Sequence, residues 1–216
     1  TQTWATAKKV PSVLRGHNAV AVGGKLYTFG GNRGTASAIY SNTVNIYDPA
    51  TDAWTTGRAA PVRWAYGGAD YDETTGKIFF VAGDNGSCVD CAGQFPKQAY
   101  GYHVASNTWD ATASSYAALV TDYPGVHMQS VSAGNGKVYS FNGGYYDGTS
   151  DRAPFPFVLV LDAASNTWAS SPSVPDPMER LSPMALTEGG SIYVLGGLPD
   201  GEAGPAARHA PLARLR

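Results

Sequence analysis

Paired glycines that close an alternating strand pattern recur along this chain, and they constrain its fold more than any other feature. The stretch KLYTFGG ends on Gly30 and Gly31, where glycine costs backbone entropy and offers no side chain to pack. The same ending recurs in KIFFVAGD at Gly83, in KVYSFNGG at Gly143 and Gly144, and in SIYVLGG at Gly196 and Gly197. Repetition every 50 to 60 residues indicates several copies of one structural unit.

The second half of each unit repeats an aromatic pair. Tyr47 stands seven residues before Trp54 and Tyr102 seven before Trp109, whereas Leu161 takes the tyrosine position before Trp168. The tryptophans Trp4, Trp54, Trp109 and Trp168 are 50, 55 and 59 residues apart in turn. The spacing within the motif is therefore constant, and the length variation lies in the loops.

Composition indicates an all-β protein of short strands and frequent turns. The 216 residues include 26 glycines and 13 tyrosines, with no long helical periodicity. Segments such as DPATD, GNGK and ASNT have the residue types that favour turns. A formal charge of −2 gives no electrostatic footprint for nucleic acid, and no apolar stretch is long enough for membrane insertion.

The motif order resembles that of the kelch repeat over residues 1 to about 200. It consists of Arg-x-His, an apolar strand, the glycine doublet, a variable loop and the Tyr-x6-Trp pair. The resemblance implies a kelch-type β-propeller or partial propeller of about four blades, each a four-stranded antiparallel sheet. In that architecture the glycines allow close backbone approach near the central channel. The tryptophans Trp54, Trp109 and Trp168 are expected to pack between blades, with ligand stacking as the alternative.

The blade units are expected at 5–57, 58–112, 113–171 and an incomplete 172–200, all within one region spanning 1–200. Residues 201–216 show no strand alternation, so we expect a linker or disordered tail there. Two hypotheses account for the unfinished blade. The chain is part of a longer propeller, which we favour, or its N-terminal segment supplies an outer strand to the fourth blade. An open arc would need further blades or a second subunit to cover it.

One loop carries both cysteines, in the stretch DNGSCVDC. The leading hypothesis is a local disulfide between Cys88 and Cys91, with free thiols or a metal or redox role as alternatives. Asn85 begins an N-glycosylation sequon that would be used in a secreted eukaryotic protein. Both features favour an extracellular or secretory localisation, although a cytoplasmic one stays open.

A resemblance to galactose oxidase, a secreted kelch-like enzyme, implies the alternative of a copper oxidase. The four histidines His17, His103, His127 and His209 and the many tyrosines are compatible with that chemistry. Against it, no histidine pair has the spacing of metal ligands, and both cysteines lie together in one loop, where a disulfide suits them better. We therefore predict no metal, no cofactor and no catalytic residue.

Long, dissimilar loops at 32–42, 84–98 and 145–157 are the candidates for recognition, since variable loops on a rigid scaffold often bind partners. They carry the aromatic and arginine side chains that dominate interfaces, namely Arg33, Tyr40, Phe95, Tyr145, Tyr146, Arg152, Phe155 and Phe157. Some of these aromatics are expected to pack beneath their own loops. The similar openings of the units also align Arg15, Arg63 and Arg180 around one mouth, where they either contact a partner or pair with neighbouring carboxylates.

The sequence thus favours a non-enzymatic binding or scaffold module that recognises a protein, or a glycan, through these loops. The alternatives are the copper oxidase and an architectural surface or wall component. Metal analysis would separate the first two, and self-association would indicate the third.

Overall fold

The structure is a computed structural model that describes residues 3–12, 14–33, 40–81, 83–84, 97–119, 128–141, 145–146, 151–152, 157–173, 184–188, 190–195 and 213–215. Every regular element among them is a β-strand, so the expected all-β class is confirmed. These residues contain no helix long and apolar enough to cross a membrane.

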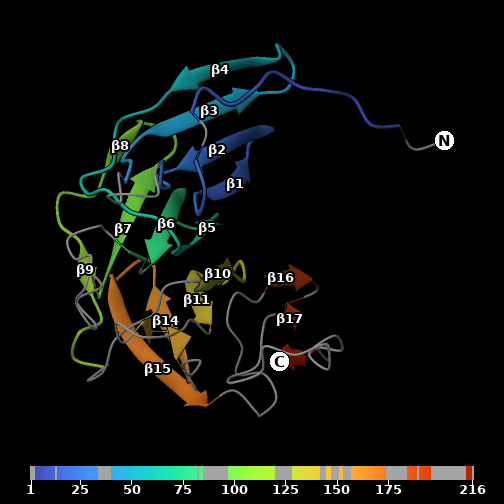
Figure 1. Cartoon of the computed structure of the whole chain (residues 1–216). Coiled ribbons are helices and arrows are strands. Elements are labelled where there is room, and N and C mark those ends of the chain that lie inside the picture. Colours follow the sequence, from blue (N-terminus) through green and yellow to red (C-terminus); the bar gives the residue numbers. More distant parts are fainter. Residues whose placement is uncertain are drawn as a thin grey trace.

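Four antiparallel sheets follow one another along the chain (Figure 1). The first consists of β1 (Asn18–Val22), β2 (Lys25–Phe29), β3 (Val44–Asp48) and β4 (Ala53–Thr56). The second consists of β5 (Gly68–Asp72), β6 (Lys77–Val81), β7 (Gln98–His103) and β8 (Thr108–Trp109), with β9 (Ser114–Ser115) also paired to β7.

The third sheet contains β10 (Gln129–Ser132), β11 (Lys137–Phe141), β14 (Phe157–Asp162) and β15 (Thr167–Ser173). A small hairpin of β12 (Tyr145–Tyr146) and β13 (Asp151–Arg152) lies in its long loop. The fourth sheet contains β16 (Met184–Glu188), β17 (Ser191–Leu195) and β18 (Ala213–Leu215). Because β18 pairs with β17, residues 213–215 depart from the linker or disordered tail expected at 201–216.

The sheets are arranged as blades around a common centre, with β1, β5, β10 and β16 innermost and β4, β8 and β15 on the outside (Figure 1). The strand β5 contacts β1 and β10, and β10 in turn contacts β16. Each blade thus packs face to face on the next, as the propeller architecture requires.

Apolar side chains fill the space between neighbouring blades. Along β6, Ile78 and Phe80 point into the cluster shared with the first blade, and Phe79 and Val81 into the cluster shared with the third. A third cluster, around Val131, Phe141 and Ile192, joins the third and fourth blades. Burial on both faces explains the continuous apolar run IFFV at residues 78–81, where a half-exposed strand would alternate apolar and polar residues.

Close backbone contact explains why glycine ends the second strand. Gly30 and Gly31 have φ values of 62° and 101°, which disfavour any side chain. A Cβ at Gly30 would collide with the carbonyl oxygen of Trp64, and that oxygen accepts the Gly31 N–H at 2.8 Å. Gly83 is the counterpart of Gly31, with the same φ of 101°, and the Ala65 oxygen of its own blade would lie 2.7 Å from a Cβ there.

In the first two blades the motif tyrosine binds a turn residue, and that turn residue and the motif tryptophan bind the chain segment that leads into the blade. In the second blade, the Asn107 Oδ1 accepts hydrogen bonds from the Tyr102 hydroxyl at 2.7 Å and the Arg58 N–H at 2.6 Å. The indole of Trp109 donates to the Arg58 carbonyl at 2.9 Å. We call this arrangement the clamp and residues 58–61, which it holds, the strap.

The first blade has the same clamp, and the third a variant of it. The Asp52 Oδ1 accepts hydrogen bonds from the Tyr47 hydroxyl and the Lys8 N–H, and the Trp54 indole donates to the Lys8 carbonyl. In the third blade Trp168 donates instead to the Ser114 hydroxyl at 2.7 Å, and Leu161 has no hydroxyl to contribute. The turn residues Asp52, Asn107 and Asn166 share positive φ values of 48°, 55° and 58°, a conformation that Asp and Asn tolerate.

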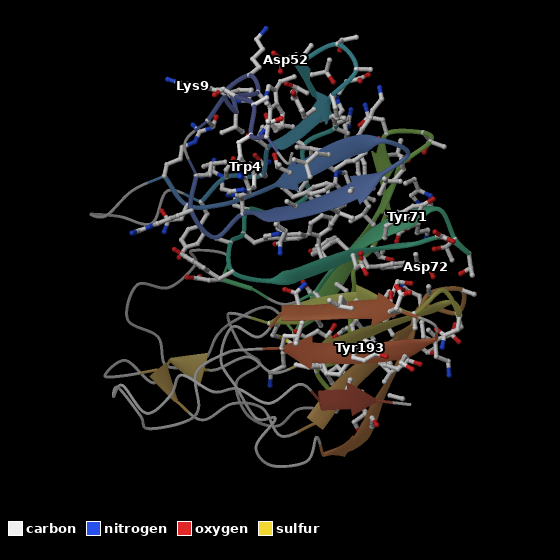
Figure 2. The ribbon with its side chains drawn as sticks, turned by 90° about the vertical axis from the view of Figure 1, so that its right-hand side faces the viewer. Trp4, Lys9, Asp52, Tyr71, Asp72 and Tyr193 are labelled. Carbon is white, nitrogen blue, oxygen red and sulfur yellow. The ribbon has the colours of Figure 1, made fainter. Side chains whose placement is uncertain are left out.

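Residues 3–10 form no strand, and Lys8 contacts the first blade rather than the fourth. Trp4 is fully exposed, and Figure 2 shows it with Lys9 and Asp52 on the side of the first blade. The hypothesis that this segment completes the fourth blade therefore receives no support from the described residues.

Candidate functional site

The glycine ends of the second strands, the long loops and the segments that open each blade meet at one end of the blades. Isolated bridges join Arg15 to Asn32, Asn32 to Tyr40, and Ala65 to Asp84. We call the end formed by residues 14–18, 30–33, 40–43, 63–67 and 83–84 the long-loop end. The opposite end carries the tight turns between the first and second strands.

Strand pairing at this end changes the alignment of the first two units. Asn18 pairs with Phe29 and Gly68 with Val81, so Arg15 corresponds to Ala65 and not to Arg63. The sequence comparison matched the two arginines and thereby slipped by two residues. Both arginines are nevertheless exposed at the long-loop end, because each lies in the segment that leads into the first strand of its blade.

Tyr66 occupies a strained position that corresponds to Gly16. Their φ values are 62° and 65°, and a left-handed conformation is unfavourable for a bulky residue. The Tyr66 N–H donates to the Gly16 carbonyl at 2.7 Å, and the tyrosine ring lies where a Cβ on Gly16 would be. The first blade therefore has glycine at a point where the aromatic ring of the second blade covers it.

A hydrogen bond from Tyr40 to Asp84 ties the loop of the first blade to the second. Burial, helped by the neighbouring carboxylate of Asp84, raises the pKa of the Tyr40 hydroxyl well above its usual range, so it remains a proton donor to that carboxylate. Tyr40 was predicted as a surface contact. It is buried instead, because its polar end has this partner inside the fold.

The other predicted loop residues fall into three groups. Arg33 is exposed and donates to the Ser12 hydroxyl at 3.3 Å. Tyr145 and Tyr146 pair with Arg152 and Asp151 in the β12–β13 hairpin, and Phe157 begins β14. The remainder lie outside the described residues, namely Phe95, Phe155 and Arg180, with Asn85, Cys88, Cys91, Gly143, Gly144, Gly196 and Gly197.

A polar pocket of about 300 Å³ lies at the opposite end of the axis and receives residues from all four innermost strands. Its lining includes Ala21 from β1, Asp70 and Tyr71 from β5, Ser132 from β10 and Thr187 from β16. Figure 2 shows Tyr71 and Asp72 on β5 in this part of the molecule, with Tyr193 on the neighbouring fourth sheet.

Two carboxylates beside this pocket have opposite pKa shifts. Burial raises the pKa of Asp70, although the N–H groups of Ser132 and Tyr71 donate to it. Burial acts in the same direction on Asp72, but hydrogen bonds from Thr74 and Thr75 outweigh it and lower the pKa. This pocket could not be predicted from the sequence, because its residues come from four different repeats.

The described residues contain no group of three or more histidine, cysteine, aspartate or glutamate side chains that could hold a metal ion. His17 contacts the Leu14 carbonyl at 3.2 Å. His103 lies 2.8 Å from Asp110, which also binds Lys77 at 2.8 Å. His127 and His209 lie outside the described residues.

Comparison with known proteins agrees with this geometry. The kelch motif profile matches residues 14–59. Kelch-like protein terF of Aspergillus terreus is 25% identical over an alignment covering 91% of this chain and 52% of its own. Kelch-like protein 25 of Xenopus tropicalis is 27% identical, with 92% of this chain and 31% of its own covered. The chain thus spans about half and a third of the lengths of these relatives.

A solved structure, that of YjhT, has a similar fold. The TM-score is 0.71 at 19% sequence identity, over 90% of this chain and 62% of that one. At this identity the likeness concerns the fold alone.

Proposed function

We propose that this chain, which is a kelch-repeat protein with a propeller fold, is a protein-interaction module that binds its partner at the long-loop end. Proteins with kelch repeats generally act as interaction scaffolds. The observation that carries the proposal is Tyr66. A strained aromatic residue stands there at a repeat position where glycine is the relaxed choice.

The surroundings of Tyr66 fit a protein partner. The exposed side chains of Arg15, Arg33 and Arg63 lie at the same end, and arginine and tyrosine are enriched at interface hot spots. The hydrogen bond from Tyr40 to Asp84 fixes the C-terminal base of the first long loop to the second blade, and a preorganised surface costs less entropy on binding. The positive side chains favour a partner with an acidic surface.

Affinity capture with paired variants tests the proposal. Tyr66→Gly removes the ring and relaxes the backbone, so the fold should persist while partner capture is lost. Arg63→Glu should reduce capture at least tenfold because it reverses a charge at the long-loop end. Lys9→Glu, at an exposed position on the side of the first blade (Figure 2) and outside the long-loop end, is the matched charge control and should capture normally.

Equal capture by the wild type, Tyr66→Gly and Arg63→Glu would contradict the proposal. Capture of glycans but not proteins on arrays would replace the protein partner by a carbohydrate. Stoichiometric copper in the purified protein would favour the oxidase, and concentration-dependent self-association without a partner would favour the architectural role.

An extracellular localisation is a further part of the proposal, supported by the spacing of Cys88 and Cys91 and by the sequon at Asn85. Mass spectrometry of the protein from its native source, with and without reduction, should show one disulfide and an occupied glycosylation site. Two free thiols and an unmodified asparagine would contradict it.

A further inference from the structure

A groove of about 550 Å³ runs along the outer rim of the second blade. One wall is the strap, with Arg58, Ala59 and Pro61, and the other is formed by Asn107, Thr108 and Trp109. The groove therefore lies between the segment that enters the blade and the blade's outermost strand β8.

The clamp binds the main chain of Arg58, and the residue itself lines the groove. The N–H of Arg58 is bound by Asn107 and its carbonyl by Trp109. The side chain is exposed, and no acidic side chain pairs with it among the described residues. Among the described residues that line the groove, Arg58 alone is charged.

Asn107 adds hydrogen-bond donors to the same groove. Its Oδ1 must face the Arg58 N–H, because a main-chain N–H can only donate. The exposed Nδ2 is then left with two N–H donors that find no acceptor among the described residues. A guanidinium and an amide N–H₂ together suit a carboxylate or phosphate oxygen.

The corresponding position of the first blade has the opposite chemistry. Asp52 replaces Asn107, and its carboxylate accepts the same two hydrogen bonds, from Tyr47 and from the N–H of Lys8. A negative group there would repel an anionic ligand. The donor-only arrangement is therefore a property of the second blade and not of the clamp in general.

The rest of the groove is apolar. Ala59, Pro61 and the partly exposed indole of Trp109 stand beside the donors, and the volume falls in the range of sites that hold peptide side chains or small ligands. We propose that this groove binds an extended acidic segment of a partner protein, with a carboxylate on Arg58 and Asn107 and an adjacent apolar side chain on Trp109 and Pro61.

Fluorescence anisotropy with a labelled hexapeptide pool tests the inference on the whole chain. In the pool a fixed glutamate is flanked by leucine, phenylalanine or proline, and a matched pool has lysine instead of glutamate. The glutamate pool should bind, and binding should weaken as salt is raised from low to high concentration because the pairing is exposed. The lysine pool should bind at least tenfold more weakly.

Variants assign the binding to the groove. Arg58→Glu should lower the affinity for the glutamate pool at least tenfold while keeping both main-chain clamp contacts. Arg58→Lys should retain part of that affinity. Arg63→Glu, an equally exposed arginine outside the groove, should have no effect. In NMR spectra the indole N–H signal of Trp109, identified by its loss in Trp109→Phe, should shift on titration.

Unchanged affinity in Arg58→Glu, equal loss in Arg63→Glu, or equal binding of the lysine pool would overturn the inference. Displacement of the peptide by an equal concentration of inorganic phosphate would reduce the site to a simple anion site and would also overturn it. Because the long-loop variants do not alter this groove, its failure and that of the proposed function are distinguishable.

Discussion

If glycine at position 30 allows two blades to approach each other, alanine there should lower the free energy of unfolding more than alanine at Gly24 of the same blade. Gly30 and Gly24 both have positive φ, at 62° and 75°. A Cβ at Gly24 would meet nothing within 4 Å, whereas one at Gly30 would collide with the carbonyl of Trp64 in the next blade. Gly24→Ala therefore measures backbone strain alone, and Gly30→Ala measures strain together with the close approach.

The structure sets the expected magnitudes. A left-handed alanine costs about 1–2 kcal/mol, and this is the whole effect expected for Gly24→Ala. In Gly30→Ala the Trp64 carbonyl must also move away from the buried Gly31 N–H, which it binds at 2.8 Å. Leaving a buried donor unsatisfied costs a further ~1–3 kcal/mol. We therefore expect Gly30→Ala to lose roughly 2 kcal/mol more than Gly24→Ala, the middle of that range.

Urea unfolding followed by tryptophan fluorescence measures both free energies of unfolding. With unchanged m-values, the difference can be assigned to stability and not to a change in the exposed surface. In thermal unfolding it corresponds to a melting temperature about 4–8 °C lower for Gly30→Ala than for Gly24→Ala. Equal losses in the two variants would refute the argument that glycine stands at position 30 because two blades approach each other there.

Three further predictions concern the clamp residue Tyr102, the loss of stability at low pH, and the strained residue Tyr66. Tyr102→Phe should lower the free energy of unfolding by ~1 kcal/mol through loss of one hydrogen bond. Burial raises the pKa of Tyr102 to about 12, so wild-type stability should fall between about pH 10 and 12, and a fall of the same size in Tyr102→Phe would contradict this. Asp72→Asn should flatten the loss of stability below about pH 4 in urea titrations, because a lowered folded-state pKa stabilises the fold above the unfolded value and loses that effect as pH falls; an unchanged acid profile would contradict it. The free energy of unfolding of Tyr66→Gly, measured by calorimetry, should lie within about 1 kcal/mol of the wild-type value, because relief of backbone strain offsets the lost packing of the ring. A larger loss of stability would make Tyr66 a purely structural residue.

Much of the blade architecture could be predicted from the sequence, because glycine doublets and the tyrosine–tryptophan spacing report local requirements that recur in each unit. Only part of the clamp could be predicted from the sequence. An aspartate or asparagine stands two residues before each of Trp54, Trp109 and Trp168, which was a usable signal. The acceptors of the Trp54 and Trp109 indoles are main-chain carbonyls, however, and a main chain has no sequence signature.

The functional surfaces were harder to predict for the same physical reason. Arg15 and Arg63 appeared equivalent because their side chains match, whereas the register is set by strand pairing with Phe29 and Val81. The burial of Tyr40 depends on Asp84 in another blade. The groove at Arg58 joins the end of one unit to the end of the next, and no motif within one unit describes it.

The clamp also has a mechanical consequence. The strap that begins at Arg58 follows the last strand of the first blade, yet it is fastened by Asn107 and Trp109 near the end of the second. Tension applied to the N-terminal side would thus be carried across the interface into the second blade before that strap could detach. In a pulling experiment the first two blades should rupture as one linked event, and cutting the fastening with Asn107→Ala should split that event into two weaker ones.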